Sequence, residues 1–109
     1  MRRTLAISTR GGEGVLRISA SGEVDMDSSP RLLEAIRAGL KDSPRVELDL
    51  KEVGYMDSSG IAVLVQGLKL ARRLKADYSI LDPSPQVMAV IELSQLADFF
   101  AVKRSGGAE

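Results

Sequence analysis

Two Asp-Ser-Ser triplets supply hydroxyl groups that could take part in phosphate chemistry, Asp27-Ser28-Ser29 and Asp57-Ser58-Ser59. Pro30 follows the first triplet, and proline suits the first turn of a helix that a preceding serine can cap. Gly60 follows the second, although glycine inside a helix costs on the order of 1 kcal/mol relative to alanine. Capping by Ser28 or Ser29 therefore explains the first triplet, whereas Gly60 indicates a further role for the second.

The corner at Gly60 could serve two kinds of chemistry. The missing side chain leaves room for a phosphate or for the backbone of another molecule, and a helix N-terminus supplies free amides and a positive partial charge. A serine at such a position tolerates phosphorylation, and Asp57 would add to the negative charge of the new phosphate. Spacing alone supports two interpretations of Ser58, a helix cap and a regulatory phosphorylation site.

The composition argues against most catalytic chemistry. The 109 residues include no cysteine and no histidine, which removes the usual zinc ligands, the Ser-His and Cys-His nucleophile pairs and the commonest general base. Lysine plus arginine and aspartate plus glutamate number 15 each, so no overall field attracts nucleic acid. No segment approaches the roughly 18 apolar residues that span a bilayer, and the N-terminus lacks the apolar core of a signal peptide. We therefore predict a cytoplasmic protein without catalytic residues, cofactor or metal, which neither binds nucleic acid nor inserts into a membrane.

Alternating hydrophobic patterns predict the elements that position the two triplets. The order of these elements predicts one α/β domain of residues 1–104, with a mixed, mostly parallel sheet and helices packed mainly on one face, and a disordered tail at 105–109. A final short strand or helix is expected at 98–102. The predicted strands cover residues 4–9, 15–20, 46–50 and 78–81, with a hairpin turn at 11–14, and the predicted helices start at Ser28 or Ser29, at Ser58 or Ser59, and near Val87.

The second predicted helix, which ends at Leu74, has an unusually wide apolar arc. One interpretation is burial between the sheet and a neighbouring helix, and the other is an exposed face that docks a partner. Its first stripe comprises Ile61, Leu64, Val65, Leu68 and Ala71, and a second stripe beside it comprises Val63, Gly67, Leu70 and Leu74.

Three motifs occur in a fixed order in this chain, Gly22-Glu23-Val24-Asp25, Val46-Glu47-Leu48-Asp49-Leu50 and Tyr55-Met56-Asp57-Ser58-Ser59-Gly60-Ile61. Together they resemble the STAS domain and, more narrowly, the bacterial anti-sigma factor antagonists. The resemblance extends from about Leu5 to Val102. It departs from the family at Leu74-Lys75-Ala76, where many antagonists carry a glycine pair, and at Ser94-Gln95-Leu96, where many carry a glycine near the end of the last helix.

The resemblance implies a STAS-like fold and a phosphorylation-controlled partner switch. In that family the unmodified antagonist binds an anti-sigma factor that is also a serine kinase, which frees the sigma factor. The kinase phosphorylates the antagonist, the complex separates, and a phosphatase resets the system. The antagonist itself catalyses nothing. Carried over by position, Ser58 is the phosphoacceptor, and the residues expected to bind the partner are Asp25, Asp57, Ser58, Ser59, Gly60 and Val63.

Two other functions stay open at the level of sequence. A second STAS branch also resembles this chain, the small subunits of ABC-type lipid transporters that maintain outer-membrane asymmetry, but that branch often has threonine where Ser58 stands. The other alternative is a nucleotide-binding or enzymatic domain that uses the Gly60 corner as a phosphate cradle. No glycine-rich loop with a following lysine supports it, and the segment 11–14 lies between predicted strands.

Overall fold

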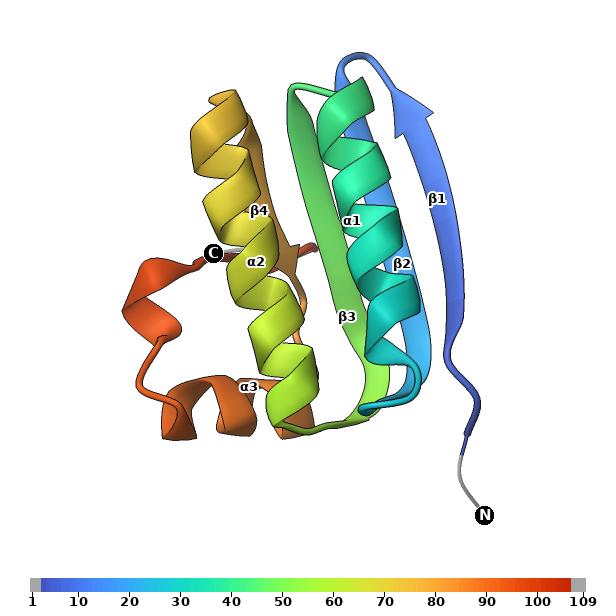
Figure 1. The fold of residues 1–109 in the computed structure, drawn as a ribbon, viewed down its shortest axis with the longest axis vertical. Coiled ribbons are helices and arrows are strands. Elements are labelled where there is room, and N and C mark those ends of the chain that lie inside the picture. The colour runs from blue at the N-terminus through green and yellow to red at the C-terminus, as the bar shows by residue number, and fades with distance from the viewer. Residues whose placement is uncertain (1–2, 107–109) are drawn as a thin grey trace.

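One five-stranded sheet organises the chain, in a computed structural model that describes residues 3–106. The strands are β1 (Ala6–Gly12), β2 (Val15–Val24), β3 (Arg45–Met56), β4 (Asp77–Leu81) and β5 (Ala101–Lys103). They lie in the sheet in their sequence order (Figure 1). β1 and β2 are antiparallel, whereas every later pair is parallel. The prediction of a mixed, mostly parallel sheet is confirmed.

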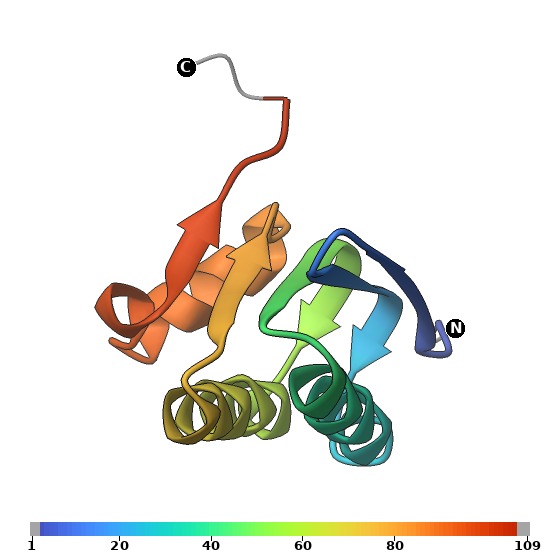
Figure 2. The same cartoon turned by 90° about the horizontal axis from the view of Figure 1, so that it is seen from above.

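Helices cover mainly one face of this sheet, as predicted. The helices are α1 (Ser29–Asp42), α2 (Ser58–Leu74) and α3 (Pro85–Leu93), followed by a 3-10 helix, η1 (Ala97–Phe99). Figure 2 shows α1 and α2 side by side beneath the strands, and Figure 1 shows that they run in the same direction. α3 packs against β3, and the Ser84 hydroxyl that caps α3 also donates to the carbonyl oxygen of Val53 over 2.5 Å.

The hairpin between β1 and β2 has the turn that its sequence predicts. Glu13 and Gly14 both have positive φ angles, 54° and 82°. A two-residue turn of this kind matches the right-handed twist of paired strands. Both strands continue further than the alternation at 4–9 and 15–20 suggests, and the extension of β2 to Val24 carries it to the loop that precedes α1.

The wide apolar arc of α2 is explained mainly by burial. Val63 is 4% exposed, and Gly67 is buried where α2 meets α1 and β4. A Cβ on Gly67 would lie 2.6 Å from Tyr78 Oη and 3.0 Å from Ile36 Cγ2, so only glycine permits this packing. Burial raises the pKa of Tyr78, which keeps the phenol protonated, and it donates to the carbonyl oxygen of Leu64 over 3.1 Å. The prediction of burial is confirmed for this part of the helix.

The opposite face of the sheet carries charged side chains in ion pairs, both between strands and within one strand. Arg17 on β2 contacts Glu47 on β3 at 3.1 Å, and Lys51 contacts Asp49 at 3.5 Å within β3. Figure 2 shows neither α1 nor α2 on this side. The polar alternation of these strands therefore marks the face that the two long helices leave uncovered.

The C-terminal segment contains both of the elements considered for 98–102, because η1 is followed directly by β5. The structure corrects the start of the predicted disordered tail. Ser105 donates from its backbone amide to Asp82 Oδ1 over 2.8 Å and from its hydroxyl to Asp82 Oδ2, and these bonds lower the pKa of Asp82. The remainder of that predicted tail, 107–109, lies outside the described residues.

Lys75 and Gln95 stand where the resemblance leads us to expect glycine, and both adopt the backbone conformation that glycine favours. Their φ angles are 58° and 63°. Lys75 terminates α2 in this left-handed conformation, and its amide donates to the carbonyl oxygens of Ala71 and Arg72. The two departures from the family pattern therefore leave the backbone path intact, at the cost of some strain.

Candidate functional site

The corner between β3 and α2 makes different use of its two serines. Asp57 is the N-cap residue, and its Oδ1 accepts hydrogen bonds from the Ser59 amide over 2.9 Å and from the Ser59 hydroxyl over 2.5 Å. The Ser58 side chain is exposed, and within residues 3–106 no hydrogen bond to its hydroxyl is recorded. Asp57 therefore caps the helix and holds Ser59, while the Ser58 hydroxyl faces solvent at the positive end of the helix.

Gly60 has an internal role, which corrects the interpretation that it leaves room for another molecule. The residue is buried, and a Cβ there would clash with Met56 Cγ and lie 3.0 Å from Val24 Cγ1. Glycine is required because the first turn of α2 packs directly onto the ends of β2 and β3. The burial of Gly60 therefore gives no support to a phosphate cradle at this corner.

The loop between β2 and α1 is held by its own polar side chains. Asp25 Oδ1 accepts from the amides of Asp27 and Ser28, each over 3.0 Å. The Ser28 hydroxyl accepts from the Asp25 amide and lies 3.0 Å from the carbonyl oxygen of Glu23. Ser28 occupies the N-cap position of α1, but its side chain makes no capping hydrogen bond, and Ser29 already belongs to the helix. The prediction that a serine side chain caps this helix is therefore wrong, because the Ser28 hydroxyl is used inside the loop.

The two corners lie next to each other. The amide of Asp57 donates to the carbonyl oxygen of Val24 over 3.3 Å, and Val24 pairs with Met56 across the parallel strands. Gly22, with a φ of 100°, allows the segment before β1 to pack closely on β2, since a Cβ there would clash with the carbonyl oxygen of Thr4. The loop from Gly22 to Ser28 and the exposed Ser58 hydroxyl therefore belong to one end of the molecule.

The structure keeps four of the six predicted partner-binding residues at or near the surface. Ser58 is exposed, and Asp25, Asp57 and Ser59 are partly buried. Gly60 and Val63 are buried in the packing of α2, and their contact with a partner stays a prediction.

Two residues at this end of the molecule escaped the sequence reasoning. Met26 is 77% exposed in the loop after β2, and Tyr55 is 45% exposed beside Glu23 at the end of β3. The available signal was Met26 itself, an apolar residue between two aspartates where no helix or strand pattern requires one. Large exposed apolar side chains next to polar groups are typical of protein interfaces.

Charges of both signs surround a shallow cavity of about 280 Å³ beside this loop. Glu23, Asp25 and Asp27 line it together with Arg3 and Arg31. The Arg31 guanidinium also donates to the carbonyl oxygen of Leu5 over 2.7 Å, which ties α1 to the start of the chain.

Two further properties limit what this site can hold. Among residues 3–106, no group of three or more aspartate or glutamate side chains is arranged to hold a metal ion. None of the helices described combines the length and apolarity needed to cross a membrane. The reactive group at this end of the molecule is a solvent-exposed hydroxyl. The surface around it carries acidic and apolar side chains.

Comparisons with known proteins agree on one family. A family model described as "Mlab, STAS domain" matches residues 7–102. An anti-sigma-B factor antagonist of Listeria monocytogenes is 30% identical over 91 residues, which cover 83% of this chain and 80% of that protein. An anti-sigma factor antagonist from Mycobacterium paratuberculosis superimposes with a TM-score of 0.83 at 26% identity, covering 92% of this chain and 86% of its own. The Bacillus cell fate determinant SpoIIAA in its phosphorylated form shares the fold, with a TM-score of 0.69 at 18% identity and coverage of 89% and 90%.

Proposed function

This chain belongs to the STAS domain family and, within it, to the anti-sigma factor antagonists, and from that premise we propose that it is a partner switch controlled by phosphorylation of Ser58. The observation that carries the proposal is the contrast at the second triplet. The Ser59 hydroxyl is bound to Asp57, whereas the Ser58 hydroxyl is exposed at the start of α2.

The physical consequence of phosphorylation at Ser58 is local. A phosphoserine adds about two negative charges near neutral pH. The partial positive charge at the start of α2 tolerates that charge, so the fold persists. Asp57 lies next to Ser58, so an interface shaped around a neutral hydroxyl would meet a concentrated negative spot instead. Separation from the partner then follows from electrostatic repulsion and needs no refolding.

The proposed partner surface combines the polar corner with neighbouring apolar groups. Ser58, Asp57 and Ser59 form its centre, and the loop that contains Asp25 forms its edge. Met26 is the apolar anchor that we add to the surface, because interface energy is concentrated in a few large side chains that become desolvated. Asp25 acts mainly by holding this loop in shape.

The partner proposed for this surface is an anti-sigma factor that is also a serine kinase, with a separate phosphatase that removes the phosphate. The relatives are named as antagonists of anti-sigma factors, which supports the first part of this assignment. The SpoIIAA structure in a phosphorylated form has the same fold, which supports the proposal that this chain is phosphorylated. In this scheme the protein acts in the cytoplasm and is a substrate of its partner's chemistry, with no catalysis of its own.

The test uses the serine-kinase anti-sigma factor of the same organism. Incubation with the kinase and ATP should place one phosphate on Ser58, mapped by mass spectrometry. In calorimetric titrations Ser58→Ala should bind the kinase and resist phosphorylation, whereas Ser58→Asp should bind about a hundredfold more weakly. Ser8→Asp, which adds the same charge at an exposed position on β1, is the matched control and should bind as the unmodified protein does. Phosphate on Ser59 or Ser28, or undiminished binding by Ser58→Asp, would contradict the proposal.

A second candidate function is that of a STAS subunit in an ABC-type lipid transporter. The description of the matching family model favours it. The two candidates differ in the protein that binds to the Ser58 corner. Titration with the transporter ATPase of the same organism should give no binding if the partner switch is correct, and binding that withstands Ser58→Asp would favour the transporter instead.

A further inference from the structure

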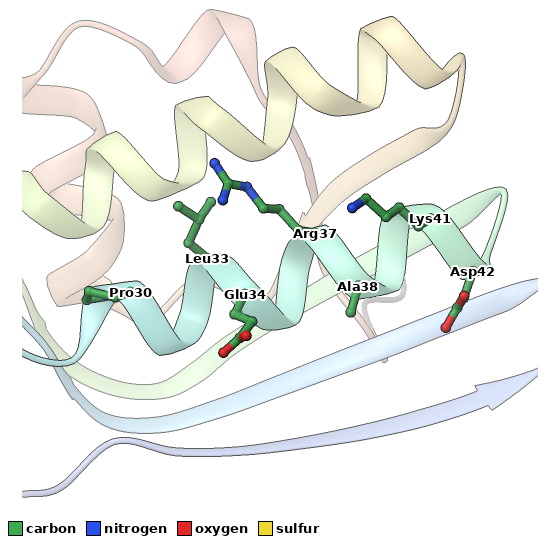
Figure 3. A pocket seen from close by; sticks show the side chains of 7 residues that line it. All are labelled: Pro30, Leu33, Glu34, Arg37, Ala38, Lys41 and Asp42. Atoms are coloured by element: carbon green, nitrogen blue, oxygen red, sulfur yellow. The ribbon is translucent and has the colours of Figure 1, made fainter.

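A groove between α1 and α2 is lined by four cationic side chains. Arg37 and Lys41 stand one turn apart on α1, and Lys69 and Arg73 stand one turn apart on α2. The groove has a volume of about 380 Å³, and its remaining lining residues are Gln66 and Leu70. In Figure 3 the side chains of Arg37 and Lys41 reach toward α2, whereas those of Glu34 and Asp42 point away from it.

None of these four cations forms an ion pair with a carboxylate in the part of the chain that the structure describes, although Glu34 and Asp42 lie near Arg37 and Lys41 on α1. The ion pairs recorded there involve other residues, namely Arg17 with Glu47, Arg45 with Asp77, Lys51 with Asp49 and Lys103 with Glu47. Like charges four residues apart on a helix repel each other and destabilise it by a few tenths of a kcal/mol. The groove holds two such pairs facing each other, which is an unfavourable arrangement unless something negative binds there.

Compensation of the helix dipoles explains only half of the cluster. Lys41 and Arg73 lie in the last turns of α1 and α2, where cations stabilise the exposed carbonyl groups. Arg37 precedes the last residue of α1 by five positions, and Lys69 precedes the last residue of α2 by the same number. The dipole effect falls off within the last turn, so these two cations call for another explanation.

The packing of the two helices fixes the width of this groove. Gly67 allows α2 to approach α1 at Ile36, and the buried Tyr78 bonds to the backbone of α2 behind it. The cations therefore project from two rigid helices and not from a flexible loop. Because the two backbones are already in place, binding there carries no cost for ordering a loop and only that of ordering the side chains.

We propose that this groove binds an extended acidic segment, rich in aspartate or glutamate, of a protein partner. A concave groove with Leu70 half-buried in its lining suits a single peptide strand that places carboxylates between two rows of cations. A nucleic-acid duplex or a membrane surface is broader than the groove and would also cover the outer side of α1. Glu34 and Asp42 stand on that side and would repel phosphate groups.

The groove is separate from the Ser58 corner. Lys69 and Arg73 follow Ser58 along α2 by about 16 Å and about 22 Å of helix rise. A phosphate on Ser58 therefore cannot bind to Lys69 or Arg73 of its own chain. One molecule could hold a partner at the Ser58 end and an acidic segment in the groove at the same time, and the second interaction does not depend on the proposed switch.

The experiment measures binding of a fluorescein-labelled oligoglutamate peptide by fluorescence anisotropy at low ionic strength. The variant Arg37→Gln/Lys69→Gln removes one cation from each side of the groove, at the two positions that the helix dipoles do not explain. The control Arg10→Gln/Arg72→Gln makes the same change in net charge at exposed residues that do not line the groove. We expect the peptide Kd to rise about tenfold or more in the groove variant and to change less than about twofold in the control.

Three results would overturn the proposal. Equal weakening in both double variants would mean that the peptide senses only net charge. Tighter binding of duplex DNA or of phosphatidylserine vesicles than of the peptide, lost in the groove variant, would assign the groove to another class of ligand. Amide NMR shifts on addition of the peptide that avoid Gln66 and Leu70 would place binding elsewhere. Thermal melts of both variants establish that the compared proteins are folded.

Discussion

The two Asp-Ser-Ser corners have the same three residues and opposite arrangements of their hydroxyl groups. At the first corner, Asp25 holds the loop from outside the triplet, and the middle serine, Ser28, is enclosed by hydrogen bonds. At the second corner the aspartate of the triplet itself, Asp57, caps the helix and binds the last serine. The middle serine, Ser58, is then left at the surface. The position of the capping carboxylate therefore decides which hydroxyl is exposed to solvent.

The residue after each triplet extends this contrast. Pro30 is exposed in the first turn of α1, which its fixed φ suits. Gly60 is buried in the first turn of α2, where the ends of two strands leave no room for a side chain. The first corner is therefore built from polar contacts within a loop, and the second from close packing beneath an exposed serine. Substitutions at equivalent positions of the two corners should therefore have different effects on stability.

The largest difference in the free energy of unfolding is expected between substitutions at the residue that follows each triplet. Gly60→Val should lower the free energy of unfolding by about 3 kcal/mol, because overpacking forces Met56 and Val24 from their positions. Pro30→Ala should cost less than about 1 kcal/mol, since this exposed proline acts mainly by restricting the unfolded chain. Urea denaturation followed by circular dichroism measures both. A Gly60→Val protein as stable as the parent would show that the corner is looser than the structure indicates.

Sequence patterns were sufficient for the order of elements and insufficient for the roles of single residues in the corners. The alternation of Val46, Leu48 and Leu50 and the helical spacing around Leu64 depend only on local periodicity, and both elements formed as expected. The burial of Gly60 depends on Met56 and on a residue of another strand. Contacts of that kind are set by tertiary packing and have no local signature.

The cationic groove was missed for the same reason. Arg73 lies in the last turn of α2, a place where cations are usual, so its position along the helix gives no signal of a groove. Arg37 is distant in the sequence, and only the packing of α1 against α2 brings the two rows of cations together. Net charge, which is zero for the whole chain, conceals such a local concentration.

The next largest difference is expected between the middle serines. Ser28 should matter more for stability, and Ser58 should matter more for partner binding. Ser28→Ala should cost about 2 kcal/mol, because it leaves the Asp25 amide without its partner and loosens the loop before α1. Ser58→Ala should change stability by less than about 0.5 kcal/mol, as is usual for an exposed side chain without recorded contacts. Thermal melts of both variants provide the comparison, and equal costs would mean that Ser58 is also a structural residue.

The aspartates that open the triplets should differ by a smaller amount. Asp57→Ala removes the cap of α2 and should cost about 1 kcal/mol. Asp27→Ala should cost less than about 0.5 kcal/mol, because at the first corner the carboxylate of Asp25 holds the backbone amides instead. Chemical denaturation of the two variants checks this assignment, and a larger loss for Asp27→Ala would reverse it.

The smallest effect is expected at the far ends of the helices that the two corners begin. α1 ends at Ser43 in an extended conformation, with φ of −138°, whereas α2 ends at Lys75 in a left-handed one, with φ of 58°. Lys75→Gly should therefore raise the free energy of unfolding by about 0.5 to 1 kcal/mol, because glycine adopts this conformation without strain from a Cβ. Ser43→Gly is the matched control and should lower the free energy of unfolding by a similar amount. Glycine adds freedom to the unfolded chain at this position, and the substitution removes the hydrogen bond from the Ser43 hydroxyl to the carbonyl oxygen of Gly14. Paired urea titrations resolve changes of this size when the slopes agree. Opposite signs for the two glycines would support the left-handed end of α2, and a loss of stability in both would show that Lys75 is held there by contacts stronger than its backbone strain.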